Sequence, residues 1–192
     1  MEWVLASASP RRKELLRERI AEFDIIPAKG DEKDEGLREA ALVKALAAQK
    51  AREVAALPQA KNKAVLGADT IVALDGETLG KPRDEQDAMR MLRALSGRTH
   101  QVYTGVCISV PTKSGARKEY IAAEKTSVRF YKLSDEKIAA YIKTGSPMDK
   151  AGAYGIQDGG LVESIDGSYS NVVGLPLELI GEMLRKIDTN GV

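Results

Sequence analysis

The chain has 192 residues, and its 29 lysines and arginines nearly balance its 28 aspartates and glutamates, which leaves a formal net charge of +1. With 43% apolar and 30% charged residues, the composition is that of an ordinary folded protein and excludes a disordered, collagen-like or membrane-spanning chain. The balanced charge argues against a polybasic protein that coats nucleic acid or membranes.

The first part of the chain alternates between strand and helix patterns. Short apolar runs predict strands, and apolar residues at helical spacing predict helices. In chain order we expect a strand at 3–6, a helix at 11–20, a strand at 23–27, a helix at 37–56, and strands at 64–74 and 77–79. Asp75-Gly76 is a strong hairpin signal between the last two strands.

The second part continues the alternation around a long antiparallel pair of strands. We expect a helix at 84–95, strands at 100–110 and 119–131, a helix at 134–143, a glycine-rich irregular segment at 149–160, a strand at 161–165 and a helix at 176–187. Asp84 and Ser134 suit the N-caps of their helices, and Gly97 suits a helix end. Alternating strands and helices with a central antiparallel pair predict an α/β protein with a mixed sheet. We expect a single domain over residues 1–192.

The compartment is predicted from cysteine use and from the lack of long apolar runs. Cys107 is the only cysteine, so no internal disulfide is possible, and its apolar neighbours predict a buried thiol. No apolar run reaches the ~20 residues of a membrane span, and the N-terminal residues become polar at Ser7, too early for a signal-peptide core. We therefore expect a cytoplasmic protein.

The segment Ser7-Ala8-Ser9-Pro10-Arg11-Arg12 joins the first predicted strand to the first predicted helix. Ser9 suits the N-cap, and Pro10 suits the first helical position. Backbone N–H groups at a helix start attract phosphate, and the two arginines add forked positive charge suited to phosphate oxygens. The same residues also fit a well-capped, solvent-exposed helix start that binds nothing. This segment alone therefore leaves both a phosphate site and a plain helix start open.

Asp69 lies within a strongly apolar predicted strand, after Gly67 and Ala68. A buried carboxylate needs a metal, a basic group or a hydrogen-bond donor, and small neighbours would let a ligand approach closely. A structural aspartate that caps a neighbouring turn fits the pattern equally. Lys81, in Gly80-Lys81-Pro82 after the hairpin, is either a ligand for phosphate or an ordinary exposed lysine, and the spacing of this segment does not match a P-loop.

The irregular segment 149–160 is the third candidate. A glycine-rich loop of this length is typical of a functional or mobile region. Gln157 offers an amide donor and acceptor that suit the edge of a base, or it is an ordinary loop glutamine. His100 is the only histidine, which argues against a zinc site, and we expect it at a sheet edge or in the core.

Taken together, the candidate segments and several further motifs resemble those of the Maf family, from residue 4 to about residue 180. The motifs are Leu5-Ala6-Ser7-x-Ser9-Pro10-Arg11-Arg12, Gly67-Ala68-Asp69-Thr70, Gly80-Lys81-Pro82, Leu95-Ser96-Gly97-x-x-His100, Tyr103-Thr104-Gly105-Val106, Asp149-Lys150-Ala151-Gly152-Ala153-Tyr154-Gly155-Ile156-Gln157 and Asn171-Val172-Val173-Gly174-Leu175-Pro176-Leu177. The joint match is far more specific than any one of them.

This resemblance implies a nucleoside triphosphate pyrophosphatase, which cleaves between the α- and β-phosphates and yields a nucleoside monophosphate and pyrophosphate. It also implies a fold like that of the inosine triphosphate pyrophosphatases: a long mixed sheet flanked by helices, with two lobes around a deep cleft and no separate linker. Members of the family are commonly homodimers and use Mg²⁺ or Mn²⁺. No nucleic-acid or membrane partner is expected.

The resemblance also implies roles for particular residues. Arg12, Thr70 and Gln157 match the branch that hydrolyses dTTP and UTP, so these pyrimidine nucleotides, and modified uridine nucleotides, are the expected substrates. Asp69 is expected to orient or deprotonate the attacking water and, with Glu32, to hold the metal. The residues expected to bind the substrate are Ser7, Ser9, Arg11, Arg12, Lys50, Thr70, Lys81 and Gln157.

A second function class is kept open. Family members have been associated with septum formation, so the alternative is a non-catalytic nucleotide-binding regulator. The intact acidic residues of the matched motifs favour an enzyme, because a pure binder would gain nothing from carboxylates beside a polyanion. A nucleic-acid binder is a weaker third choice, since aromatic residues make up only 5% of the chain.

Overall fold

The computed structural model describes residues 1–31 and 36–189. Within these ranges the strands are β1 (Trp3–Leu5), β2 (Asp24–Ile25), β3 (Ala64–Leu74), β4 (Glu77–Leu79), β5 (Thr99–Pro111), β6 (Arg117–Phe130) and β7 (Val162–Asp166). The α-helices are α1 (Pro10–Arg17), α2 (Glu39–Ala55), α3 (Glu85–Leu95), α4 (Asp135–Ile142), α5 (Tyr169–Val173) and α6 (Leu177–Thr189). Short 3₁₀ turns occupy 58–60, 146–149, 151–153 and 156–158.

The strands of the described ranges form one mixed sheet in the order β2-β1-β3-β5-β6-β7, with β4 paired to β3. The β1 strand is parallel to both β2 and β3. At the centre, β3 runs antiparallel to β5 and β5 runs antiparallel to β6, so three long strands form a continuous ribbon. The mixed α/β fold predicted from the sequence is confirmed.

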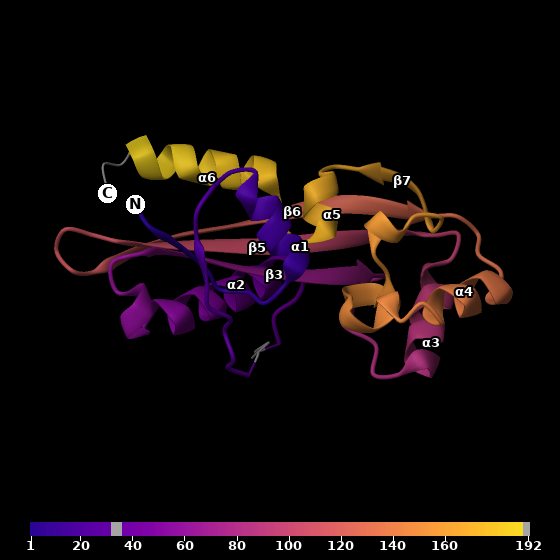
Figure 1. Cartoon of the computed structure of the whole chain (residues 1–192). Helices are drawn as coiled ribbons and strands as arrows, with labels where there is room; N and C mark the ends of the chain where they lie inside the picture. Colours follow the sequence, from indigo (N-terminus) through magenta and orange to yellow (C-terminus); the bar gives the residue numbers. More distant parts are fainter. Residues whose placement is uncertain (32–35, 190–192) are drawn as a thin grey trace.

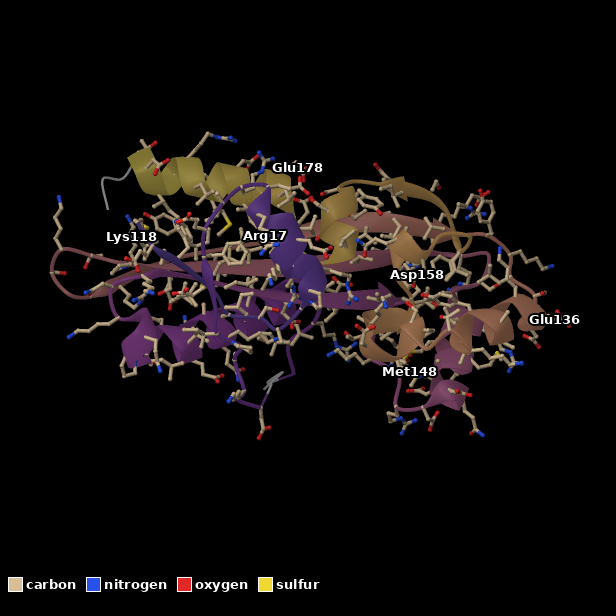
Figure 2. The ribbon with its side chains drawn as sticks, viewed as in Figure 1. Arg17, Lys118, Glu136, Met148, Asp158 and Glu178 are labelled. Carbon is tan, nitrogen blue, oxygen red and sulfur yellow. The ribbon has the colours of Figure 1, made fainter. Side chains whose placement is uncertain are left out.

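Helices cover the two faces of the sheet and one of its ends. Figure 1 shows α2 and α6 on opposite faces, and α3 and α4 together at the end farthest from the two termini. One hydrophobic core packs α1 and α6 against β1, β3 and β5, and another packs α3 and α4 around Phe130. The two ends therefore form two lobes on one shared sheet. In Figure 2, Lys118 and Glu136 mark these opposite ends.

Helix α2 lies unusually close to the centre of the sheet. A Cβ atom on Gly67 would meet the backbone of Ala47 and Ala51, and one on Gly105 would meet the backbone of Val43. Side chains at these two sheet positions are therefore excluded by the helix that covers them. The close approach brings the middle of α2, which carries Lys50, next to β3.

Several predictions about buried residues have clear outcomes. Cys107 is fully buried, as expected, and burial raises the pKa of its thiol to about 12. His100 is fully buried in the core, which is one of its two expected locations. Its ring lies edge-on to Phe130 and Tyr154.

Helix α5 is absent from the elements predicted from the sequence. It has only five residues, too few for a periodic pattern, and Ser168 caps it by accepting a hydrogen bond from the N–H of Asn171 at 3.2 Å. Gly174 ends the helix with a φ of 123°, a conformation that favours glycine. Within the described residues, no helix has the length and apolarity to cross a membrane.

Candidate functional site

A cleft of about 770 Å³ opens between the two lobes. It is lined by the start of α1, the middle of α2 and β3, the end of α5, the segment after β4, and the 3₁₀ turns that follow α4. Of the predicted site residues, those that line it are Ser7, Ser9, Arg11, Arg12, Lys50, Asp69, Thr70, Lys81 and Gln157. Glu32, the remaining predicted residue, lies outside the described residues.

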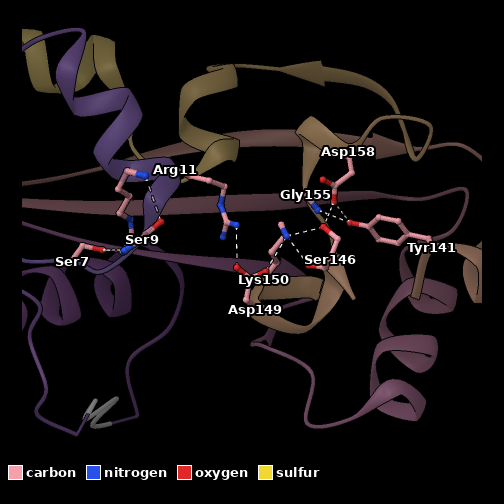
Figure 3. A network of polar contacts seen from close by, with 10 residues as sticks. Ser7, Ser9, Arg11, Tyr141, Ser146, Asp149, Lys150, Gly155 and Asp158 are labelled. Carbon is pink, nitrogen blue, oxygen red and sulfur yellow. Dashed lines mark hydrogen bonds and ion pairs between the residues drawn. The ribbon is translucent and has the colours of Figure 1, made fainter. Parts of the chain in front are cut away.

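The cleft has two contrasting sides. The sheet wall consists of residues 7–12, Lys50, Asp69, Thr70 and Gly174. The loop wall is the segment 146–158, of which residues 149–151 and 154–157 line the cleft. Figure 3 shows the start of α1, on the sheet wall, beside the 3₁₀ turns of the loop wall.

The turn between β1 and α1 lines the cleft with residues 7–12. Ser9 is the N-cap, and its hydroxyl accepts from the N–H of Arg12 at 3.4 Å. The hydroxyl of Ser7 accepts from the N–H of Ser9 at 3.2 Å, which tightens the turn. Pro10 fixes the first helical residue. A helix start of this kind, flanked by two arginines, is suited to an anion.

Asp69 and Lys50 form an ion pair on the sheet wall. The Nζ atom of Lys50 lies 2.5 Å from Oδ1 of Asp69, and the two side chains are only 18% and 10% exposed. Their mutual attraction offsets part of the cost of removing both charges from water. Asp69 therefore has the basic partner that a carboxylate in an apolar strand requires, within the cleft rather than at a structural turn.

A divalent cation fits these residues. Among the described residues, no group of three or more acidic, histidine or cysteine side chains is placed to hold a metal by itself. Mg²⁺ is usually held by one or two carboxylates together with substrate phosphates and water, and Asp69 supplies one such carboxylate inside the cleft. Oxygen ligands of this kind suit Mg²⁺ and Mn²⁺ alike.

Arg12 is held in place by acceptors on three different elements. Its Nε donates to the carbonyl of Gly174 at 2.9 Å, and its Nη2 donates to the hydroxyl of Thr70 at 3.0 Å. Its Nη1 lies 3.5 Å from the hydroxyl of Ser7. A planar guanidinium bound at several corners has a fixed direction. Arg12 therefore presents positive charge to the cleft from a defined position.

Arg11 reaches across the cleft to the loop wall. Its Nη1 lies 3.2 Å from Oδ2 of Asp149, whose side chain is 63% exposed. Lys150 donates to Oδ1 of Asp149 at 2.9 Å and to the carbonyl of Ser146 at 2.6 Å (Figure 3). Burial alone would raise the pKa of the Asp149 carboxyl, but the hydrogen bond from Lys150 and the charge of Arg11 together lower it. Asp149 is therefore a carboxylate that joins the two walls.

Hydrogen bonds within the loop wall, and from Tyr141 of α4, hold it together. Tyr141 of α4 donates to Asp158 at 2.5 Å and accepts from the N–H of Gly155 at 3.0 Å, and Ser146 donates to Asp158 at 2.6 Å (Figure 3). Burial raises the pKa of the Tyr141 hydroxyl, with a further contribution from Asp158. These bonds fix the turn 156–158, which carries the exposed side chain of Gln157.

An aromatic cluster supports the loop wall from below. The hydroxyl of Tyr154 and Nε2 of His100 share a hydrogen bond of 2.8 Å, and Phe130 packs edge-on against both rings. Burial lowers the pKa of His100 to about 4. The ring is therefore neutral near pH 7 and acts as a core residue that anchors Tyr154.

The structure adds residues whose roles do not follow from their motifs alone. Asp149 and Lys150 belong to the segment 149–157, but the partner of Asp149 is Arg11, which lies 138 residues away in the sequence. Gly174 contributes through its carbonyl oxygen, and a backbone atom leaves no mark in the sequence. Contacts of this kind depend on the tertiary fold, so in the sequence only the resemblance to the family motifs could indicate that these residues matter.

Three comparisons with known proteins extend these observations. Residues 2–187 match the family described as Maf-like protein. A dTTP/UTP pyrophosphatase of Agathobacter rectalis is 48% identical over 96% of each chain, and one of Thermococcus gammatolerans is 50% identical over 94% of each. A HAM1 protein of Coxiella burnetii is similar in fold, with a TM-score of 0.55, 16% identity, and coverage of 97% of this chain and 99% of that one.

Proposed function

Because the chain belongs to the Maf family, we propose that it is a hydrolase that converts dTTP and UTP into the monophosphate and pyrophosphate. The observation that carries this proposal is the cleft. It gathers cationic side chains and the start of α1 around one buried carboxylate, Asp69. Relatives whose sequences are about 50% identical to this chain are named for this activity.

The sheet wall supplies the groups that a triphosphate requires. The Ser7–Ser9 turn and the side chains of Arg11 and Arg12 bind the phosphate chain, which carries about four negative charges near neutral pH. Lys81 approaches from the segment after β4 and adds a further cation. Positioning and charge stabilisation supply most of the catalysis in phosphoryl chemistry, and no covalent intermediate on the protein is required.

Asp69 is the proposed catalytic residue. Its carboxylate accepts a hydrogen bond from the attacking water, and so orients the water or removes its proton. Lys50 pairs with Asp69 in the structure, and we propose that it exchanges this partner for a phosphate oxygen when a nucleotide binds. A divalent cation held by Asp69 and the phosphates would polarise the α-phosphate and lower the pKa of its bound water.

Selection of the base is assigned to residues from both walls. Arg12 and Thr70 form a hydrogen-bonded pair on the sheet wall, and Gln157 presents an amide from the loop wall. An amide can both donate to and accept from the Watson–Crick edge of a pyrimidine. We therefore propose that Gln157 contacts the base and contributes to the preference for thymidine and uridine nucleotides.

A panel assay tests the proposal. The purified protein is incubated with canonical and modified triphosphates and with Mg²⁺ or Mn²⁺ in turn, and pyrophosphate and orthophosphate are measured separately. We expect pyrophosphate release to be fastest with dTTP and UTP. Release of orthophosphate alone would contradict the site of cleavage. Binding without any release would favour the alternative, a non-catalytic regulator of septum formation.

The family resemblance supports three further proposals. We propose that the enzyme is a homodimer, that it acts in the cytoplasm, and that it has neither a nucleic-acid nor a membrane partner. Light scattering coupled to size exclusion gives the mass of the assembly directly. A monomer at micromolar concentration would contradict the first of these proposals.

A further inference from the structure

A chain of hydrogen bonds leads from the cleft into the interior of the sheet. It begins at Arg12, whose Nη2 donates to Oγ1 of Thr70 on β3 at 3.0 Å. Oγ1 of Thr70 lies 2.9 Å from Oγ1 of Thr104 on β5, and Thr104 donates to the carbonyl of Asn171 in α5 at 3.1 Å. Thr104 and Asn171 have no solvent exposure.

The distances favour one direction for these bonds. The Thr104 hydroxyl has a carbonyl acceptor, that of Asn171, at 3.1 Å, whereas the carbonyl nearest to the Thr70 hydroxyl, that of Gly174, lies at 3.5 Å, so we assign the Thr104 proton to Asn171. Thr104 therefore accepts from Thr70, and Thr70 in turn accepts from Arg12. Each donation points away from the cleft, and hydrogen bonds aligned in this way strengthen one another. The guanidinium of Arg12 thus begins a directed series that ends on α5.

The end of α5 also binds Arg12 directly. The carbonyl of Gly174 accepts from Nε of Arg12 at 2.9 Å, and the N–H of Gly174 donates to the carbonyl of Asn171 at 3.0 Å. The oxygen of Thr70 lies 3.5 Å from the same Gly174 carbonyl. The last turn of α5 therefore offers two carbonyls, one to the arginine and one to the hydroxyl series.

The side chain of Asn171 clamps this turn to the sheet. Its Nδ2 donates to the carbonyl of Val102 on β5 at 3.1 Å and to the hydroxyl of Thr126 on β6 at 2.9 Å. Its Oδ1 is buried and has no hydrogen-bond partner among the described residues. Burying an acceptor without a hydrogen bond costs free energy, and an apolar side chain at this position would avoid that cost. An apolar side chain could not make the two hydrogen bonds to Val102 and Thr126, so we assign the role of Asn171 to these bonds.

We propose that Thr104 and Asn171 are positioning residues, which fix the guanidinium of Arg12 and the hydroxyl of Thr70 for contact with the nucleotide. This inference rests on the proposed function and extends it to two buried residues that do not line the cleft. Asn171 holds the end of α5, and Thr104 keeps the proton of Thr70 away from the Gly174 carbonyl. The lone pair of Thr70 then stays turned toward Nη2 of Arg12.

The substitution Thr104→Val tests the proposal with little change in shape. Without its acceptor on Thr104, the Thr70 hydroxyl turns its proton to the Gly174 carbonyl, 3.5 Å away, and no longer holds its lone pair toward Nη2 of Arg12. We expect the KM for dTTP to rise by about fivefold to tenfold, the effect of one lost hydrogen bond, with little change in kcat. Thr104→Ser keeps the hydroxyl and should restore the wild-type KM.

Ser109→Ala is the matched control. Ser109 is also buried on β5, and its hydroxyl accepts from Arg117 at 2.8 Å, away from the cleft. This variant also loses one buried hydroxyl of β5, so it should destabilise the fold about as much as Thr104→Val while keeping the wild-type KM. An equal rise of KM in both variants would overturn the proposal, and so would an unchanged KM in Thr104→Val.

A second measurement separates this proposal from the proposed function. The N–H proton at Nε of Arg12 can be followed by NMR in ¹⁵N-labelled protein, with Arg12→Lys to assign the signal. We expect its exchange with solvent to be about fivefold to tenfold faster in Thr104→Val than in wild type or Ser109→Ala. If the wild-type protein releases no pyrophosphate from dTTP or UTP, the proposed function fails, and the exchange rate still decides the positioning role.

Discussion

The two walls of the cleft carry similar charges in different surroundings. On the sheet wall, Asp69 pairs with Lys50 and is 10% exposed, and Arg12 is bound by strands and by the end of α5. On the loop wall, Asp149 pairs with Arg11 and is 63% exposed. Ion pairs in water are screened and contribute little, whereas groups withdrawn from water interact strongly. We therefore expect the chemical step on the sheet wall, and we expect the loop wall to contribute to recognition of the base rather than to chemistry.

The largest expected effect is that of Asp69→Asn, which removes the negative charge and keeps the shape. We expect kcat to fall by at least about 10²-fold, because the water loses its acceptor. Steady-state pyrophosphate release measures this, and circular dichroism checks the fold. Turnover within threefold of wild type would remove Asp69 from the mechanism and the chemical step from the sheet wall.

The buried His100, which packs beneath the loop wall, should make the stability of the folded protein sensitive to acid. His100 has a pKa of about 4 in the folded protein and an ordinary value of 6.5, so the unfolded chain binds more protons between these two values. The free energy of unfolding should therefore fall as the pH drops from about 6.5 to about 4, by about 3 kcal/mol from this group.

Urea unfolding at a series of pH values measures this slope. His100→Gln removes the titrating group, so its stability should depend less on pH in the same window. An identical slope in the variant and the wild type would show that burial of His100 does not govern acid stability. Tyr154→Phe keeps the histidine, so its slope should resemble that of wild type.

Gln157→Ala should change the preference among nucleotides more than the overall rate of hydrolysis. The side chain is exposed, so truncation should leave the fold intact, while the loss of one edge contact should reduce the preference for dTTP and UTP over purine triphosphates by about fivefold. Ratios of kcat/KM over a nucleotide panel measure the change. A uniform loss over all nucleotides would instead assign Gln157 a structural role.

The smallest effect is expected for Asp149→Asn. The substitution removes a negative charge from the cleft and frees Arg11 for phosphate, so KM should fall by up to about threefold at low ionic strength. Because the pair is exposed, the difference should shrink as salt is added. A large drop in kcat would contradict the assignment of the chemical step to the sheet wall alone, since Asp149 belongs to the loop wall.

The reach of sequence-based prediction differs among the parts of the sheet wall. Capping and periodicity predict α1 and its Ser9 cap, and an isolated carboxylate in an apolar strand marks Asp69. Lys50 was assigned only through the family resemblance, because its position opposite Asp69 depends on how α2 packs on the sheet. Helix α5 is too short for periodicity, and the Gly174 carbonyl has no side chain to predict.

The two glycines beneath α2 have a consequence for how the cleft's charges are set. Because Gly67 and Gly105 lack side chains, α2 rests directly on the strands, and the ammonium of Lys50 comes within range of Asp69. A single methyl group at either position would lift the helix and part the two charges without altering either of them. We therefore expect substitutions at these glycines, which lie inside the sheet, to change activity although neither residue lines the cleft.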